Sequence, residues 1–256
     1  MTNMEGVGLA FLVVIIGIPI LCVVVIAGWL ADRSAMKKNR EAGEPEPVNV
    51  NTRRMIRDLI IRPDAFFRTV SEGSDTLFTP FLWLFAGSIV MSAGVMAAVD
   101  LHFLMSGLVN VLFLTSVALV LMTSAIVLAW LASSGAFYAI SHLFRGSGSF
   151  RKTLQNTGYG LAPGLVLYGL VLLLGTLALT AFQIPVIPFG NPSVGNQAFS
   201  IIGRAGMLIA SLWCFFLMTH GLRYARNIPS AKAAVSVGVP VVIYLIFSNL
   251  QYLAPA

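Results

Sequence analysis

Long stretches of apolar residues alternate with short polar segments along most of this chain. A helix rises 1.5 Å per residue, so about 20 apolar residues cross a hydrocarbon core roughly 30 Å thick. Six stretches are about this long or longer: Val7–Leu30, Phe78–Val99, Leu112–Phe144, Leu161–Phe182, Ile201–His220 and Ala233–Leu250. The pattern predicts an all-α fold, a polytopic transmembrane helical bundle of about six spans.

The third stretch needs its own argument, because apolar character runs nearly unbroken from Phe103 to Phe144. As a helix this segment would be about 60 Å long, too long for one upright crossing. Two crossings would reverse the side of every later loop and place the basic segments that begin at Arg145 and at Arg223 outside, which the positive-inside rule disfavours. We therefore predict one long or tilted span, preceded by an interfacial or re-entrant piece at residues 101–111.

The segment between the first two spans divides into a tether and an amphipathic part. Residues 31–52 contain Glu41, Pro45 and Pro47 and almost nothing apolar, which is typical of a flexible linker. In residues 53–77 the apolar side chains recur at helical spacing, with arginines on the other face. Pro63 should end one helix and begin another. This bent element either lies on an anionic membrane surface or packs on the ends of the bundle, and the two alternatives are compatible.

These segments predict four regions along the chain. Residues 1–30 form an N-terminal transmembrane anchor, and residues 31–52 form a cytoplasmic linker. Residues 53–77 form an amphipathic interfacial segment, and residues 78–256 form a five-helix membrane domain. No basic residue precedes Val7, so we expect the first span to be a retained anchor and not a signal peptide.

Composition and charge agree with a membrane protein. The chain is 57% hydrophobic and 10% charged, whereas soluble domains carry roughly a quarter charged residues. The net charge of +6 does not indicate nucleic-acid binding, because no soluble segment interleaves the cations with exposed aromatic residues. Two cysteines, both within apolar stretches, exclude a disulfide framework.

The cations are segregated along the chain. Nine Lys and Arg lie between Arg33 and Arg68, three between Arg145 and Lys152, and three between Arg223 and Lys232. The sixteenth is Arg204. Because cytoplasmic loops carry an excess of Lys and Arg, we expect a multi-pass protein of the cell membrane with residues 31–77 inside and both termini outside.

Candidate functional residues fall in two basic segments and one charge pair. The loop that begins at Arg145 is rich in Gly and Ser and is either a phosphate-binding loop or an ordinary turn that carries topological charges. The candidate contacts to anionic lipid head groups or a protein partner are Arg53, Arg54, Arg57, Arg62, Gly146, Gly148, Arg151 and Lys152. Asp100 and Arg204 are a candidate structural ion pair near the outer interface.

No catalytic, cofactor-binding or metal-binding set is visible in the sequence. Three histidines without Cys or carboxylate neighbours make a poor metal site, and no nucleophile elbow or zinc-protease motif occurs. Clusters of small residues favour close helix packing within one chain or in a homo-oligomer.

Several short motifs occur in an order that resembles the Yip domain family, integral membrane proteins named for their interaction with Ypt/Rab GTPases. The motifs are Arg62-Pro63-Asp64-Ala65-Phe66-Phe67, the loop Gly146 to Thr153, Gly158-Tyr159 before Pro163, and Trp213 with Gly221-Leu222-Arg223. The resemblance covers about Met55 to Leu250. The first span has no counterpart in the usual five-helix domain, and the Asp-Leu-Tyr-Gly-Pro signature of eukaryotic members is absent. The resemblance therefore implies a prokaryotic-type member with an extra N-terminal helix.

Three hypotheses for function follow. The first is a non-enzymatic adaptor or membrane organiser with a basic cytoplasmic surface. The second is a small transporter or lipid-handling protein, which requires a polar cavity at midplane depth. The third, an intramembrane enzyme, lacks residues for acid-base or nucleophilic chemistry.

Overall fold

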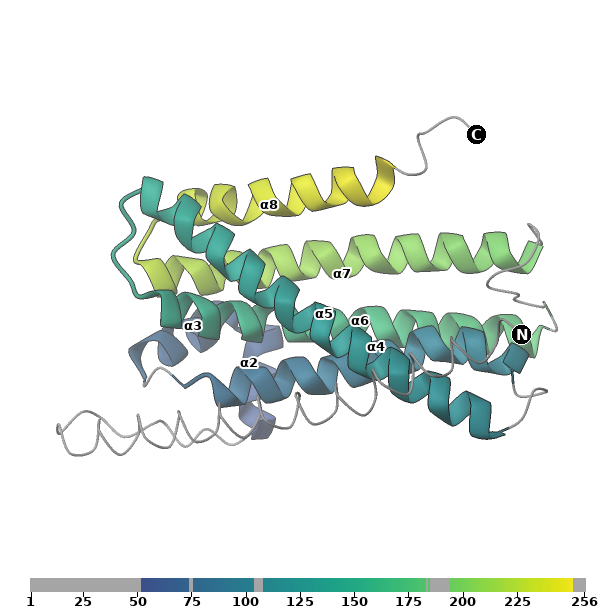
Figure 1. Cartoon of the computed structure of the whole chain (residues 1–256). Helices are drawn as coiled ribbons and strands as arrows, with labels where there is room; N and C mark the ends of the chain where they lie inside the picture. Colours follow the sequence, from purple (N-terminus) through teal and green to yellow (C-terminus); the bar gives the residue numbers. More distant parts are fainter. Residues whose placement is uncertain (1–51, 74–75, 104–107, 183, 185–193, 251–256) are drawn as a thin grey trace, which may run out of the picture. The chain divides into compact units, whose positions relative to one another are not determined.

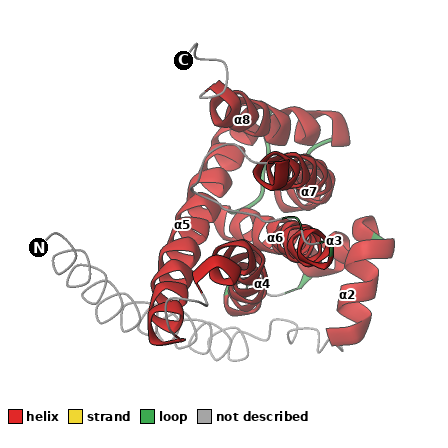
Figure 2. Ribbon diagram, turned by 90° about the vertical axis from the view of Figure 1, so that its right-hand side faces the viewer, coloured by secondary structure: helices red, strands yellow, loops and turns green. Residues whose placement is uncertain are grey.

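The computed structural model describes residues 52–73, 76–103, 108–182, 184 and 194–250 (Figure 1). In these ranges all regular structure is helical (Figure 2), which confirms the predicted fold class. The helices are α2 (Thr52–Ile61), α3 (Pro63–Glu72), α4 (Phe78–Phe103), α5 (Leu108–Leu143), α6 (Phe150–Ala181), α7 (Val194–Arg226) and α8 (Ser230–Leu250). The predicted anchor and nearly all of the predicted linker lie outside the described residues.

Four of these helices contain segments long and apolar enough to cross a membrane. The segments are Phe78–Ala97, Ser116–Leu143, Phe150–Ala181 and Gln197–Arg226, and α8 contributes the shorter apolar segment Ser230–Tyr244. The third predicted stretch is one continuous helix of 36 residues, α5, as expected. Within residues 101–111 the structure describes the end of α4 at Phe103 and the start of α5 at Leu108, and the interfacial or re-entrant piece stays a prediction.

Large apolar side chains lie uncovered along the long helices. Leu128 of α5 is 66% exposed, Leu174 of α6 is 63% exposed and Ile201 of α7 is 67% exposed. Exposed leucine and isoleucine at this density are unfavourable in water and are the normal outer surface of a protein in lipid. The exposed faces therefore support a lipid environment for these helices.

The described helices fall into two compact units that interleave along the sequence. Unit 1 contains residues 82–128 and 162–210, so it includes most of α4, the first part of α5, most of α6 and the first part of α7. Unit 2 contains Ala31–Phe81, residues 129–161 and the chain from Ser211 onward. It therefore includes α2, α3, the end of α5, the start of α6, the end of α7, and α8.

Unit 1 is held together by close contacts between helix backbones. A Cβ atom added at Gly94 would lie 2.2 Å from the carbonyl oxygen of Gly169, so α4 and α6 touch where both helices carry glycine. Between α4 and α5, the hydroxyls of Ser88 and Thr123 form a buried hydrogen bond of 3.0 Å. Small residues and interhelical hydroxyl bonds are the usual means of packing helices in lipid.

Unit 2 has its own apolar core. Its central cluster contains Phe137, Cys214, Met218, Leu222, Ile228, Ala233 and Val237, which come from α5, α7, the turn after α7, and α8. The indole N–H of Trp130 donates a 2.9 Å hydrogen bond to the carbonyl oxygen of Leu154, which links α5 to α6. This core fixes the helix ends that carry the polar residues described next.

Candidate functional site

Most of the described cations belong to unit 2. Its described Lys and Arg side chains are Arg57, Arg62, Arg68, Arg145, Arg151, Lys152, Arg223, Arg226 and Lys232. The described part of unit 1 contains only Arg204. Unit 2 carries three described acids, Asp58, Asp64 and Glu72, so it has a strong excess of positive charge.

Helix α2 has an apolar side that the protein buries and an apolar edge that it leaves uncovered. Leu59 is 1% exposed, whereas Ile60 and Ile61 are 49% and 67% exposed. Arg57 and Arg62 are exposed beside these isoleucines. An uncovered apolar edge flanked by arginines is typical of a helix that lies in a membrane interface. The side chains of Arg53 and Arg54 lie outside the described part of the chain.

Helix α3 begins at Pro63, as predicted, and is tied to the first turns of α6. The Phe66 and Tyr159 rings meet edge to face with their centroids 5.4 Å apart. The Lys152 ammonium donates a 2.8 Å hydrogen bond to the carbonyl oxygen of Ser71. The buried Asn156 amide donates to the Ser71 hydroxyl at 2.8 Å and to the Gly221 carbonyl oxygen at 3.0 Å. The start of α6 therefore joins α3 to α7.

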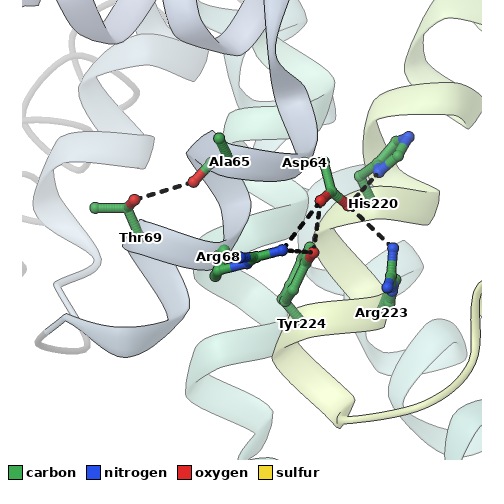
Figure 3. Close-up of polar contacts among 7 residues, drawn as sticks. All are labelled: Asp64, Ala65, Arg68, Thr69, His220, Arg223 and Tyr224. Atoms are coloured by element: carbon green, nitrogen blue, oxygen red, sulfur yellow. Dashed lines mark hydrogen bonds and ion pairs between the residues drawn. The ribbon is translucent and has the colours of Figure 1, made fainter.

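A charged cluster around Asp64 joins α3 to the last turns of α7 (Figure 3). The Tyr224 hydroxyl donates to Asp64 Oδ2 at 2.8 Å, and Arg223 Nη1 donates to Asp64 Oδ1 at 3.0 Å. His220 Nδ1 lies 3.3 Å from Oδ1, and Arg68 Nη2 lies 3.5 Å from Oδ2. We call these five residues the Asp64 cluster.

The ionised form of Asp64 is the stable form in this cluster. The hydrogen bond from Tyr224, followed by the interactions with His220 and Arg223, lowers the pKa of the Asp64 carboxyl below its ordinary value of 3.8, and burial opposes this only in part. The Tyr224 hydroxyl and the Asp64 charge likewise raise the pKa of Arg68. Asp64 and Arg68 are therefore both ionised throughout the neutral range.

The turn after α5 caps two helices at once. Arg145 adopts φ 62°, and the Gly146 amide donates to the Ser141 carbonyl oxygen at 3.0 Å. Asn227 adopts φ 55° at the end of α7, where the Ile228 amide donates to the Arg223 carbonyl oxygen at 3.2 Å. Both helices thus end in the Schellman arrangement, with a residue in the left-handed region just past each last turn.

Arg226 connects these two helix ends from inside the protein. Its side chain is almost fully buried, lies 4.2 Å from the centre of the Tyr138 ring, and donates to Ser141 Oγ at 3.0 Å and to the Gly146 carbonyl oxygen at 2.5 Å. In return, the Ser147 amide donates to the Arg226 carbonyl oxygen at 3.0 Å. The negative ends of two helix dipoles meet at the guanidinium, which explains how it is stable without a carboxylate among its described contacts.

The two glycines of this turn lie where a larger residue would clash with the end of α7. A Cβ atom on Gly148 would lie 1.6 Å from the Ala225 carbonyl oxygen, and one on Gly146 would lie 3.1 Å from Arg226 Nε. Glycine therefore lets the turn approach the end of α7. The amides of Gly146 and Ser147 already bind helix carbonyls, so this geometry matches the alternative of a capping turn better than that of a phosphate loop.

The remaining predicted residues lie in different places. Arg151 and Lys152 are half-buried in the first turn of α6. Arg204 is exposed on α7 in unit 1, and the Asp100 side chain lies outside the described residues, so their predicted pairing stays a prediction.

The Asp64 cluster and the role of Arg226 did not emerge from the sequence. In the sequence, Asp64 stands out only within the motif around Pro63, and His220 only as one of three histidines that make a poor metal site. The one available signal was an acid that directly follows Pro63 in a segment rich in arginine. The partner helix lies 156 to 160 positions away, which no local pattern identifies.

Comparisons with known proteins agree with the motifs. Residues 57–250 match the model of the Yip1 domain. An uncharacterized protein of Methanocaldococcus jannaschii is 34% identical over 112 residues, which cover 43% of this chain and 79% of that protein. No solved structure matches the chain. The family model covers well over half of the sequence, and the predicted resemblance is confirmed: the chain is a multi-pass membrane protein that belongs to the Yip1 domain family.

Proposed function

We propose that this protein is a non-enzymatic adaptor or membrane organiser whose unit 2 faces the cytoplasm and binds anionic lipid head groups. The observation that carries the proposal is the concentration of the described cations in unit 2, with Arg204 as the exception. Cytoplasmic leaflets are anionic, and each Lys or Arg near such a surface contributes about 1 kcal/mol of attraction. The exposed isoleucine edge of α2 would enter the head-group layer beside Arg57 and Arg62.

The orientation is testable by itself. A variant without Cys22 and Cys214 receives one new cysteine, either at the exposed Ser147 of unit 2 or at Arg40 of the predicted linker. Both positions should react with a membrane-impermeant thiol reagent only after the membrane is opened. Labelling of the two positions from opposite sides would overturn the proposed topology.

Lipid preference is the decisive measurement. The full chain is incubated with equimolar phosphatidylglycerol and phosphatidylcholine in mild detergent, and bound lipids are counted by native mass spectrometry. We expect an excess of phosphatidylglycerol that falls in the double variant R57Q/R62Q and persists in the control R204Q, which removes one exposed charge from unit 1. Equal binding of the two lipids by the unmodified protein would refute the proposal. A protein partner of the same surface would be acidic and would compete with phosphatidylglycerol.

The contact between α4 and α6 in unit 1 does not favour the transporter hypothesis. The α4 and α6 backbones meet directly at Gly94 and Gly169, so no polar passage runs between the two helices at that level. This contact favours the adaptor hypothesis over the transporter hypothesis.

A further inference from the structure

The Asp64 cluster holds more positive charge than its carboxylate neutralises. Arg68 and Arg223 each carry one positive charge, and Asp64 carries one negative charge. Tyr224 and His220 approach the same carboxylate as further polar partners. At neutral pH the cluster therefore retains a net positive charge of at least one, since arginine stays protonated.

The surplus charge is accessible. The Arg68 and Arg223 side chains are 58% and 39% exposed. Among the described residues, Arg68 contacts Asp64 and Tyr224 through Nη2, and Arg223 contacts Asp64 through Nη1. A guanidinium has five N–H groups, so each arginine has further donors for another acceptor.

The two arginines are also held in defined positions. Their guanidinium carbons lie 5.7 Å and 5.1 Å from the centre of the same Tyr224 ring. Asp64 fixes one nitrogen of each through its carboxylate oxygens (Figure 3). Two oriented guanidiniums are the preferred partners of a phosphate, which accepts several charge-assisted hydrogen bonds at once.

The cluster lies where lipid phosphates are found. Arg223 and Tyr224 belong to the last turn of the apolar segment Gln197–Arg226, and α3 lies against the first turns of the apolar segment Phe150–Ala181. The ends of membrane-spanning segments reach the head-group layer. Asp64 itself occupies part of the binding capacity of the arginines, because its carboxylate is the acceptor that they contact in this structure.

We propose that the Asp64 cluster is a binding site for the phosphate group of an anionic phospholipid, which Arg68 and Arg223 contact and for which Asp64 is the internal competitor. This inference rests on the proposed function and adds to it a specific site outside the residues that the sequence indicated. In the site, Asp64 orients the arginines and limits their affinity.

The test uses the same lipid-counting measurement on the full chain. Asp64→Asn removes the competing charge while it keeps an acceptor oxygen, and it should increase phosphatidylglycerol binding about twofold to fivefold, the range expected for one partly exposed charge contact. R68Q and R223Q should each decrease phosphatidylglycerol binding by a similar factor, and R68K should bind more of this lipid than R68Q. The control R204Q should leave phosphatidylglycerol binding unchanged. Unfolding curves for every variant identify any loss that arises from misfolding.

The outcomes separate this inference from the proposed function. If the unmodified protein prefers phosphatidylglycerol but D64N, R68Q and R223Q bind it equally, the site is wrong while the proposed function stands. If D64N binds less lipid although it is fully folded, Asp64 is not a competitor and the inference is overturned. If inorganic phosphate displaces the lipid at equal concentration, the site recognises free phosphate, which also overturns the assignment to lipid. Absence of any preference in the unmodified protein refutes the proposed function itself.

Discussion

Replacement of Arg226 with methionine removes the guanidinium and keeps an unbranched side chain in its place. The change deletes the two hydrogen bonds to Ser141 Oγ and the Gly146 carbonyl oxygen and the contact with the Tyr138 ring. Hydrogen bonds from a charged donor contribute about 1.5 to 3 kcal/mol each. A desolvated cation–π contact contributes about 2 kcal/mol.

An opposing effect reduces this total. The folded protein keeps a charged group out of water, and the variant escapes a desolvation penalty of several kcal/mol. Ser141 keeps its bond to the Tyr138 carbonyl oxygen, whereas the Gly146 carbonyl oxygen loses its side-chain donor. Loss of a partner from a buried group costs about 1 to 3 kcal/mol. We therefore expect Arg226→Met to lower the free energy of unfolding by about 3 kcal/mol, and Arg226→Lys by about half as much, because lysine keeps the charge without the planar stacking.

Reversible unfolding in mixed detergent micelles measures this difference. In a background in which Trp29, Trp83 and Trp213 are replaced with phenylalanine, the buried Trp130 supplies a fluorescence signal from the unit that contains Arg226. Lys232→Met, which removes an exposed charge of the same unit, is the matched control and should change the free energy by less than about 0.5 kcal/mol. If Arg226→Met were as stable as the unmodified protein, the guanidinium would not hold the ends of α5 and α7 together.

Three further changes test the capping turn and the Asp64 cluster. Gly148→Ala should lower the free energy of unfolding by about 2 kcal/mol or more, because its Cβ would overlap the Ala225 carbonyl oxygen. The control Gly135→Ala should be neutral or stabilising, because no atom lies within 4 Å of the added Cβ. Chemical unfolding compares the two variants. Arg145→Gly should raise the free energy of unfolding by about 1 kcal/mol in the same assay, because glycine adopts the positive φ of this position without strain. Because folding lowers the pKa of Asp64, its stabilisation should be fully present above its ordinary pKa of 3.8 and lost as pH falls through the folded-state value. The stability difference between the unmodified protein and D64N should thus persist at about pH 5 and shrink below pH 3.8; a difference that stays unchanged below that pH would contradict the assignment to Asp64.

The helices were predictable from the sequence because hydrophobic length and proline act locally. A continuous apolar stretch is helical in lipid, and the positive-inside rule then predicted α5 as one helix and not two. Pro63 lacks an amide hydrogen, and this predicted the boundary between α2 and α3. At residues 101–111 the length of the apolar stretch predicted an interfacial or re-entrant piece, and the described helix ends at Phe103 and resumes at Leu108 on either side of residues that the structure does not describe.

The candidate site was only partly predictable, because its contacts join distant segments. Gly146 and Gly148 were predicted to contact lipid or a partner, but the sequence could not reveal that nearby helix carbonyls already occupy the amides of this turn. Asp64 and Arg223 are 159 positions apart, so their pairing follows from the docking of α3 and not from any spacing. The motifs that carried the family resemblance meet here, because the Pro63 motif, Tyr159 and Gly221 all contribute to the contacts of α3.

The arginines of unit 2 do not contribute equally to its interaction with a membrane. The positive-inside rule counts every Lys and Arg alike, yet Arg226 is 1% exposed and binds helix ends, whereas Arg68 is 58% exposed beside an acid. A buried guanidinium that binds carbonyls attracts lipid phosphates weakly, and an arginine paired with Asp64 attracts them less than a free one. The affinity for anionic lipid should therefore follow the exposed and unneutralised cations and not the formal charge. On this argument D64N, which removes a negative charge, should increase lipid binding more than removal of Arg226 decreases it.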